Sequence, residues 1–123
     1  MLCFILILSF FKRVWVILTS VIIVDDEEDI VNSLSMLLES HEIDVIGKGY
    51  DGLEGVRLFD KLHPDVVLLD IAMPQYDWLY TLRKIREKYS VTPIIIITGD
   101  LSENHKKQIK FLKPIEILYN LFV

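Results

Sequence analysis

Carboxylate and hydroxyl side chains stand directly after three apolar runs of this sequence. Each run holds at least four consecutive aliphatic residues, and the polar residues that follow are Asp25 and Asp26, Asp70, and Thr98. Apolar runs of this length, rich in Val and Ile, are typical of strands buried in a parallel sheet. Because ligands of open α/β sheets bind where the carboxyl ends of the strands meet, we expect these side chains to converge at one edge.

Three carboxylates at one edge indicate the chemistry of such a site. Like charges at close range raise one another's pKa, so a hard divalent cation with oxygen ligands is the natural counter-charge, and we expect Mg²⁺. This ion takes one or two carboxylates together with phosphate oxygens, which leaves another carboxylate to attack phosphorus. We therefore predict that Asp25 and Asp26 hold the metal and that Asp70 forms an aspartyl phosphate beside it.

Structural and enzymatic alternatives exist for the same residues. Asp25 or Asp26 fits the N-cap of a following helix, and Thr98 fits a turn or a cap. A phosphohydrolase with Asp70 as nucleophile commonly needs an acid two residues later, where this sequence has Ala72. We therefore expect only self-phosphorylation and dephosphorylation chemistry at Asp70, and not an enzyme.

Strands and helices alternate along the part of the chain that carries these residues. Strands are expected at residues 21–24, 44–47, 66–69, 93–97 and 115–119. Helices are expected after Asp29, at 53–62, around Leu79 to Ile85, and at 101–112. In the helix at 53–62 we expect Val56 and Phe59 to face inward, and we expect a turn at 49–52. Alternating units of this length predict an α/β fold with a parallel sheet and helices on both faces.

The sequence resembles the receiver domains of two-component response regulators. The motifs that carry the resemblance are VIIVDDEEDI at 21–30, VVLLDIAMP at 66–74 and IIIITGD at 94–100. The resemblance implies a flavodoxin-like, doubly wound, five-stranded parallel sheet with the strand order 2-1-3-4-5. It also implies a phosphorelay domain whose partner is a sensor histidine kinase or a phosphotransfer protein.

Site roles follow from this resemblance at the matching positions. Asp70 is then the phosphoacceptor, and Asp26 contacts Mg²⁺ directly, whereas Asp25 acts through water. Asp70 and the backbone carbonyl of Ala72 complete the metal ligands. Thr98 is the switch hydroxyl, which moves to bond a phosphoryl oxygen.

Two positions depart from the family pattern. Trp78 stands eight residues after the phosphoacceptor, where the family usually has Gly, so we expect a strained or rebuilt loop there. The family's Lys after the fifth strand matches either Lys113, which follows Thr98 by 15 residues, or Asn120, which has the family separation. We prefer Asn120, because this alignment leaves residues 115–119 as a strand.

The residues after the fifth strand leave no room for a full last helix, so we expect this C-terminal helix to be missing or truncated. A truncated or degenerate receiver that binds without switching is therefore the first alternative function. The apolar face that such a helix would cover also predicts a homodimer.

Residues 1–18 form an apolar extension, and the receiver domain is expected over residues 19–123. The run Met1 to Phe11 spans only about 16 Å as a helix, and Lys12 and Arg13 interrupt any longer span, so we do not expect a membrane anchor. The charges follow the apolar run, which is unlike a secretory signal.

The composition of the chain indicates which partners and which cellular compartment to expect. The chain of 123 residues has a formal net charge of −5, and this acidic balance argues against direct binding of nucleic acid, whose phosphates need Lys and Arg. Its single cysteine, Cys3, cannot form a disulfide within the chain, which fits a reducing compartment, and we expect a cytoplasmic protein.

Overall fold

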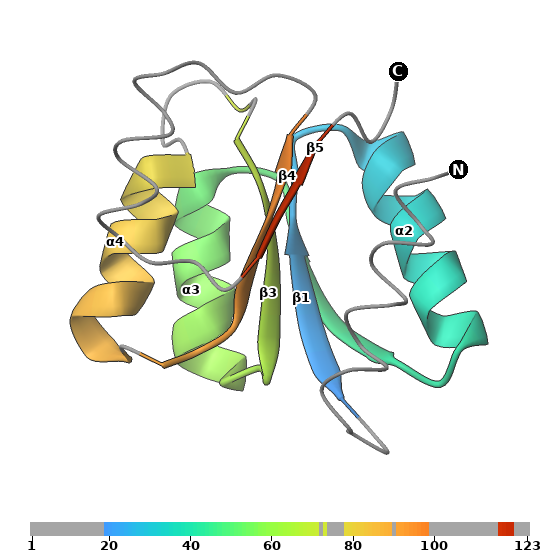
Figure 1. Ribbon diagram of the computed structural model, residues 1–123, viewed down its shortest axis with the longest axis horizontal. Helices are drawn as coiled ribbons and strands as arrows, with labels where there is room; N and C mark the ends of the chain where they lie inside the picture. The colour runs from blue at the N-terminus through green and yellow to red at the C-terminus, as the bar shows by residue number, and fades with distance from the viewer. Residues whose placement is uncertain (1–18, 72, 74–77, 90, 99–115, 120–123) are drawn as a thin grey trace.

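The computed structural model describes residues 19–71, 73, 78–89, 91–98 and 116–119, with Thr98 and residues 116–119 described by their backbone. These residues form a parallel sheet with helices on both of its faces (Figure 1). The elements in chain order are β1 (Ser20–Val24), α2 (Glu28–Ser40), β2 (Asp44–Gly49), α3 (Gly52–Leu62), β3 (Val66–Asp70), α4 (Trp78–Lys88), β4 (Ile94–Thr98) and β5 (Glu116–Tyr119).

The sheet has five strands in the order β2-β1-β3-β4-β5, and every neighbouring pair is parallel. The predicted flavodoxin-like, doubly wound α/β fold with this strand order is confirmed. β1 lies beside β3 with Val24 opposite Leu69, and β3 lies beside β4 with Asp70 opposite Ile97. The carboxyl ends of β1, β3 and β4 therefore meet at one edge of the sheet.

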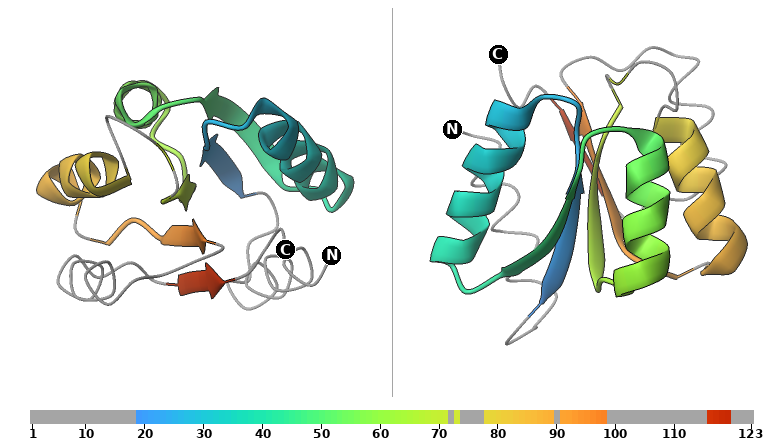
Figure 2. Two further views of the ribbon diagram at one scale, coloured as in Figure 1. Left: turned by 90° about the horizontal axis from the view of Figure 1, so that it is seen from above. Right: turned by 180° about the vertical axis from the view of Figure 1, so that it is seen from behind.

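Alternate residues of each strand serve two separate apolar clusters. In β1, Val21 and Ile23 join the cluster that contains α2, whereas Ile22 and Val24 join the cluster that contains α3 and α4. All four side chains are fully buried, as expected for a strand covered on both faces. Figure 2 shows α2 on one face of the sheet and α3 with α4 on the other.

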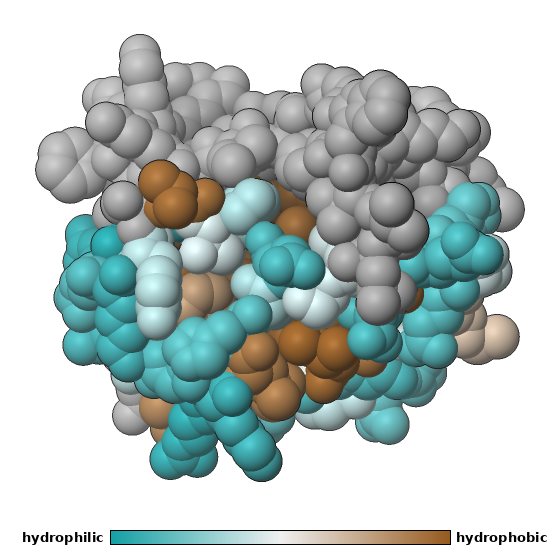
Figure 3. Space-filling model, turned by 90° about the horizontal axis from the view of Figure 1, so that it is seen from below, coloured by the Kyte–Doolittle hydropathy of each residue, from teal (hydrophilic) through white to brown (hydrophobic). Residues whose placement is uncertain are grey.

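Figure 3 shows the edge where the strands begin. Hydrophobic residues gather near the centre of this view, and hydrophilic residues lie at its left, right and lower margins. No helix within the described ranges has both the length and the apolar character needed to cross a bilayer.

The turn predicted at residues 49–52 is present but shorter, and it consists of Tyr50 and Asp51. Gly49 is the last residue of β2 and pairs with Val24, because β1 remains extended to that position. α3 then begins at Gly52, and Asp51 is its N-cap, with its side chain accepting a hydrogen bond from the Glu54 N–H at 2.8 Å.

The inward face predicted for α3 is partly wrong. Phe59 is buried as expected, but Val56 is only half-buried, and Gly52 and Gly55 are the other buried residues of the helix. Gly55 lies so close to Val24 that a Cβ added to it would be 3.0 Å from both Val24 methyl groups. The helix therefore approaches β1 through a glycine, which a count of apolar side chains does not detect.

Candidate functional site

Asp25, Asp26 and Asp70 converge at the carboxyl end of the sheet. Asp25 follows the last residue of β1, and Asp70 is the last residue of β3, so the parallel pairing of Val24 with Leu69 sets the two side by side. One carboxylate oxygen of each of the three residues lies within 4.8 Å of the others. The structure thus brings together the three carboxylates that the sequence singles out.

The three carboxylates differ in their exposure to solvent. Asp25 is 2% exposed and Asp70 8% exposed, whereas Asp26 lies on the surface. Two acidic groups are therefore held inside the domain, and the third faces outward beside them. The cluster of carboxylates is therefore open to solvent on the side of Asp26.

Backbone hydrogen bonds fix the position of Asp25. Its N–H donates to the carbonyl of Gly49 at 3.0 Å, and its Oδ1 accepts from the N–H of Glu27 at 2.9 Å. The first bond continues the pairing of β1 with β2, and the second closes a turn that leads into α2. The carboxylate is thus held between two elements and has little freedom to turn away.

The carboxyl group of Asp25 has an elevated pKa of about 7, against an ordinary value of 3.8. Burial is the largest cause, since it penalises the charged form, and the Glu27 N–H opposes the shift. The negative charges of Asp70 and Asp26 and a hydrogen bond with Asp70 raise the pKa further. A cation bound among these carboxylates would offset the repulsion between their negative charges and so lower the pKa of Asp25.

The helix-cap interpretation of the acid pair is wrong. The N-cap of α2 is Glu27, and no side chain makes a capping hydrogen bond there. Asp25 and Asp26 precede this position, and the Asp25 carboxylate is directed to the edge of the sheet. Its acceptance of the Glu27 N–H belongs to the turn between β1 and α2.

Thr98 ends β4 at the same edge of the sheet. Asp70 pairs with Ile97, and the N–H of Ile71 donates to the carbonyl of Ile97 at 3.3 Å. The backbone of Thr98 therefore lies one residue beyond Asp70 along the strand direction. This position agrees with the predicted delivery of a hydroxyl by β4, and the switch role stays a prediction.

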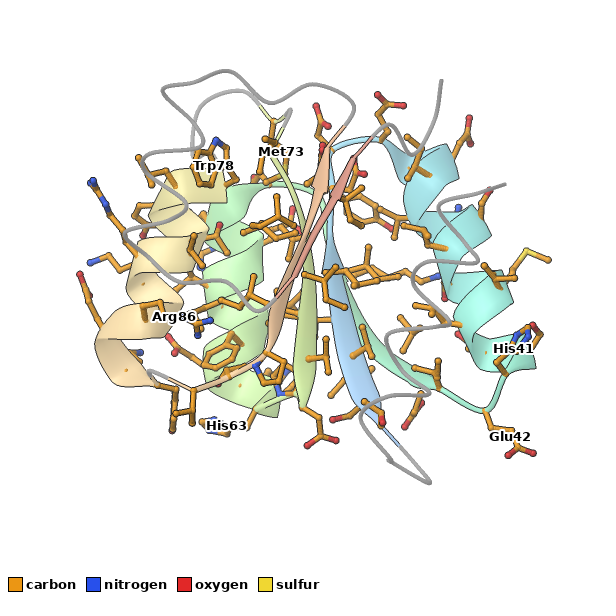
Figure 4. The ribbon with its side chains drawn as sticks, viewed as in Figure 1. His41, Glu42, His63, Met73, Trp78 and Arg86 are labelled. Atoms are coloured by element: carbon orange, nitrogen blue, oxygen red, sulfur yellow. The ribbon has the colours of Figure 1, made fainter. Side chains whose placement is uncertain are left out.

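The loop after Asp70 is anchored by apolar side chains. Ile71 and Met73 are each 6% exposed and lie in the cluster with Trp78, which begins α4 and is 2% exposed. Met73 and Trp78 lie at the carboxyl end of the sheet (Figure 4). Ala72 and the loop expected to be strained, residues 74–77, lie outside the described residues.

The position of the family's Lys also lies outside the described residues. The residues outside the described part of the chain include both candidates for this position, Lys113 and Asn120. They also include the helix predicted at 101–112, any last helix and the extension 1–18. The described backbone adds one fact, which is that β5 ends at Tyr119, opposite Thr98. Asn120 thus follows β5 directly along the chain, whereas Lys113 precedes this strand.

Two groups that shape the site are not among the residues predicted from the sequence. The Gly49 carbonyl and the Glu27 N–H bind the backbone and side chain of Asp25, respectively. The first depends on which strand pairs with β1, which no local pattern specifies. The second had a local signal, since Asp followed two residues later by a helix start is typical of an Asp turn.

The donor set fits Mg²⁺. All three side chains offer carboxylate oxygens, which this ion prefers, and their oxygens already lie within 4.8 Å of one another. Two ligands of one Mg²⁺ lie up to about 4 Å apart, at roughly 2.1 Å from the ion each, so the site needs only a small adjustment or a bridging water. Asp25, Asp26 and Asp70 are therefore the residues that would hold the ion.

The fold and the site define a class of protein. It is a doubly wound α/β domain with an acidic site at the point where the strand order reverses. The family model of the response regulator receiver domain matches residues 21–113, and the chain belongs to this family. It is a receiver domain of two-component systems, which is a signalling domain.

Relatives and solved structures agree with this family. The chain is 38% identical over 89 residues to transcriptional regulatory protein YdfI of Bacillus subtilis, with 72% of this chain and 41% of the relative covered. It is 37% identical over 97 residues to a protein-glutamate methylesterase/protein-glutamine glutaminase of Lawsonia intracellularis, with 78% and 27% covered. The structure of chemotaxis protein CheY4 of Vibrio cholerae is similar, with a TM-score of 0.78, 26% identity, and 86% of this chain and 89% of that chain covered. This chain thus spans less than half the length of the two curated relatives.

Proposed function

We propose that Asp70 accepts a phosphoryl group from a phosphohistidine of a sensor histidine kinase or a phosphotransfer protein, beside Mg²⁺ held by Asp25, Asp26 and Asp70. The backbone carbonyl of Ala72 is the fourth protein ligand in this proposal. The observation that carries it is the approach of three carboxylates within 4.8 Å at the carboxyl ends of β1 and β3.

The transfer is a substitution at phosphorus. A carboxylate oxygen of Asp70 forms the new O–P bond, and the N–P bond of the phosphohistidine breaks. The imidazole nitrogen leaves with the electron pair of that bond and takes a proton from solvent. The products are an aspartyl phosphate and a neutral histidine, so atoms and charge balance.

Each carboxylate has a distinct part in this step. Asp70 lies at the end of a fully buried strand, and this rigid position holds the attacking oxygen in place. Asp25 would lose its proton on binding of the ion, and Asp26 would contact the ion from the solvent side. Bound Mg²⁺ would neutralise charge on the phosphoryl oxygens. Thr98, at the end of β4, is positioned to respond to the new phosphoryl group.

Intact mass of the full chain after incubation with acetyl phosphate and Mg²⁺ tests the proposal. We expect the mass to rise by one phosphoryl group, and we expect hydroxylamine to remove it, as it does acyl phosphates. Asp70→Asn must abolish the adduct, and EDTA must prevent it. Asp44→Asn is the matched control, because Asp44 is an exposed aspartate at the opposite end of β2. Absence of the adduct on a folded wild-type chain would refute the proposal.

A second candidate is a receiver that binds its partner without switching. The observation that favours it is the end of β5 at Tyr119, which makes Asn120 the next residue in the chain. An amide carries no charge to pair with a phosphoryl group, unlike the family's Lys. Asn120→Lys tests this candidate: it is supported if only the variant changes its hydrogen exchange on phosphorylation, and it fails if the wild type changes as much.

The boundaries of the domain, its location and the absence of enzyme activity stay predictions. One relative is named as a methylesterase, but the chain covers 27% of that relative. We propose that the receiver occupies residues 19–123 and that its own chemistry is limited to gaining and losing the phosphoryl group.

A further inference from the structure

Trp78 is a large aromatic side chain buried at the same end of the sheet as the acidic site. It is the first residue of α4 and is 2% exposed. It belongs to the apolar cluster on the α3 and α4 face of the sheet, together with Ile71 and Met73. Figure 4 shows Met73 and Trp78 at the carboxyl end of the sheet. The indole therefore buries a large apolar area in one cluster with residues that follow Asp70.

The two residues that flank Asp70 belong to the same cluster as Trp78. Leu69 precedes Asp70 and Ile71 follows it, and both side chains are buried in this cluster. Successive side chains of a strand point to opposite faces, so Asp70 is directed away from the cluster that holds Leu69. The direction of the Asp70 carboxylate thus depends on how firmly its two neighbours are held.

The sheet holds Ile71 less firmly than it holds Leu69. The N–H of Ile71 donates to the carbonyl of Ile97 at 3.3 Å, which is longer than the usual range of about 2.7–3.2 Å. Leu69 lies inside β3, which pairs with β1 on one side and β4 on the other. Side-chain packing therefore has to secure the backbone after Asp70, and Trp78 is the largest side chain of the cluster that does so.

α4 is also fixed by contacts that do not depend on Trp78. The Thr81 hydroxyl donates to the carbonyl of Gly52 at 2.9 Å, which joins α4 to the first residue of α3. Leu82 and Ile85 are buried in the same cluster further along α4. Loss of the indole would therefore leave α4 in place and release mainly the chain that precedes this helix.

We propose that Trp78 is a positioning residue for the acidic site: the packing of its indole in the cluster with Ile71 and Met73 holds the backbone after Asp70 and so fixes the place of the Asp70 carboxylate. This role rests on the proposed function of Asp70 and deepens it. The receiver family usually has Gly where this chain has Trp78, and Gly offers no side chain to such a cluster. The chain therefore has an anchor of its own at this position.

Hydrogen exchange of the metal-free full chain tests this anchoring directly. In EDTA we expect Trp78→Ala to speed exchange of the Ile71 N–H by roughly tenfold or more, because its hydrogen bond is broken by local opening. The Val67 N–H donates to the carbonyl of Pro93 at 3.0 Å near the other end of β3 and is the internal reference. Ile85→Ala is the matched control, since Ile85 is 1% exposed in the same helix and cluster but about two turns from Trp78.

Calorimetric titration with Mg²⁺ measures the consequence for the site. We expect the dissociation constant of Trp78→Ala to rise about tenfold and that of Ile85→Ala to stay within about twofold of the wild type. Both variants lose stability in urea, so a merely structural role would affect their Mg²⁺ affinities alike. Trp78→Phe should restore the affinity, because its ring refills most of the space. If Trp78→Ala does not fold, Trp78→Leu paired with Ile85→Val makes the same comparison with smaller losses of volume.

The two measurements together decide whether Trp78 positions the site. Faster exchange at Ile71 and weaker Mg²⁺ binding in Trp78→Ala, with neither change in Ile85→Ala, support the proposal. Unchanged Mg²⁺ affinity in Trp78→Ala, or equal changes in both variants, would overturn it. The phosphoryl adduct on the wild type tests the proposed function separately: if the adduct is absent while Ile71 exchanges faster in Trp78→Ala, the function of Asp70 is refuted and the anchoring by Trp78 stands.

Discussion

The carboxyl groups of Asp25 and Asp70 meet across the parallel pairing of β1 and β3, and this proximity, added to burial, helps to raise the pKa of Asp25 to about 7. Such an arrangement opposes folding while both groups are ionised, because like charges are held together in a poorly solvated place. It therefore favours any cation that enters between them. Stability of the metal-free protein and affinity for the metal are expected to change in opposite directions.

We predict that Asp25→Asn stabilises the metal-free protein at pH 8. The ordinary pKa of this group is 3.8, and its folded value is about 7, so between these values the folded state binds more protons than the unfolded state. The contribution of Asp25 to stability thus falls as pH rises from about 4 to 7 and is lowest above 7. Removal of the charge should gain on the order of 1–3 kcal/mol in the free energy of unfolding at pH 8.

Urea unfolding of the wild type and the variant in EDTA at pH 8 and at pH 5 measures this gain. The difference should shrink at pH 5, where the wild-type carboxyl is protonated. Asp44→Asn is the control, since Asp44 is exposed and lies at the other end of the sheet. A variant that is less stable than the wild type at pH 8 would contradict the assigned cause of the pKa shift.

We predict that Mg²⁺ affinity rises with pH and levels off above about pH 7. The ion needs ionised carboxylates, so it competes with the proton on Asp25, whose pKa is raised to about 7. Below that pH the affinity should fall by up to about tenfold per pH unit, as expected for displacement of one proton. Calorimetric titration at pH 5.5, 6.5 and 8 measures the slope. An affinity that is equal at pH 5.5 and pH 8 would show that Asp25 does not ionise on binding.

Convergence of the three carboxylates could be predicted from the sequence for a simple reason. Asp25 and Asp70 each follow four aliphatic residues, and buried parallel strands place their carboxyl ends at one edge. The strand order came from the family resemblance, because periodicity does not specify which strands are neighbours. The roles of Asp25, Asp26 and Asp70 in metal binding and phosphoryl transfer stay predictions, although their proximity is observed.

Features that depend on tertiary neighbours could not be predicted. β2 extends to Gly49 because β1 is extended beside it, and a local pattern of Gly and Asp predicts a turn there instead. Gly55 is buried because Val24 lies against it, and the sequence alone suggested Val56. The fifth strand was predicted correctly within one residue, since residues 115–119 are rich in aliphatic residues and follow the turn signal Lys113-Pro114.

We predict that Gly55→Ala destabilises the domain. The added methyl group would lie 3.0 Å from both methyl groups of Val24 and 3.3 Å from a methyl group of Thr81. Val24 is fully buried and stiff at its branched carbon, so it has little room to move. Overpacking of this kind costs about 1–3 kcal/mol, and the better helix propensity of Ala offsets up to about 1 kcal/mol of it.

A double-mutant cycle with Val24→Ala isolates this contact. Gly55→Ala should cost little in the Val24→Ala background, where the space is free, and more in the wild type. Because Val24 precedes Asp25, the single variant should also weaken Mg²⁺ binding. Equal costs in both backgrounds would show that the two residues do not limit each other.

We predict that the N-cap of α3 contributes more to the free energy of unfolding than the N-cap of α2. The Asp51 side chain accepts from the Glu54 N–H at 2.8 Å, and the Glu54 side chain accepts from the Tyr50 N–H at 3.3 Å, so two backbone donors are satisfied at the start of α3. At the start of α2, the side chain of the N-cap residue Glu27 makes no capping hydrogen bond. Asp51→Ala should therefore lower the free energy of unfolding by about 1 kcal/mol, and Glu27→Ala should change it by less than about 0.5 kcal/mol.

Urea midpoints of these variants in EDTA measure the difference without interference from the metal. Asp51→Ser keeps an acceptor at the N-cap and should recover most of the loss, because serine caps helices about as well as aspartate. If Asp51→Ala and Glu27→Ala had equal effects, the hydrogen bond to Glu54 would not stabilise α3. α3 packs on Val24 through Gly55, and Val24 directly precedes Asp25. Fraying of the first turn of α3 would therefore also loosen the strand that positions the Asp25 carboxylate.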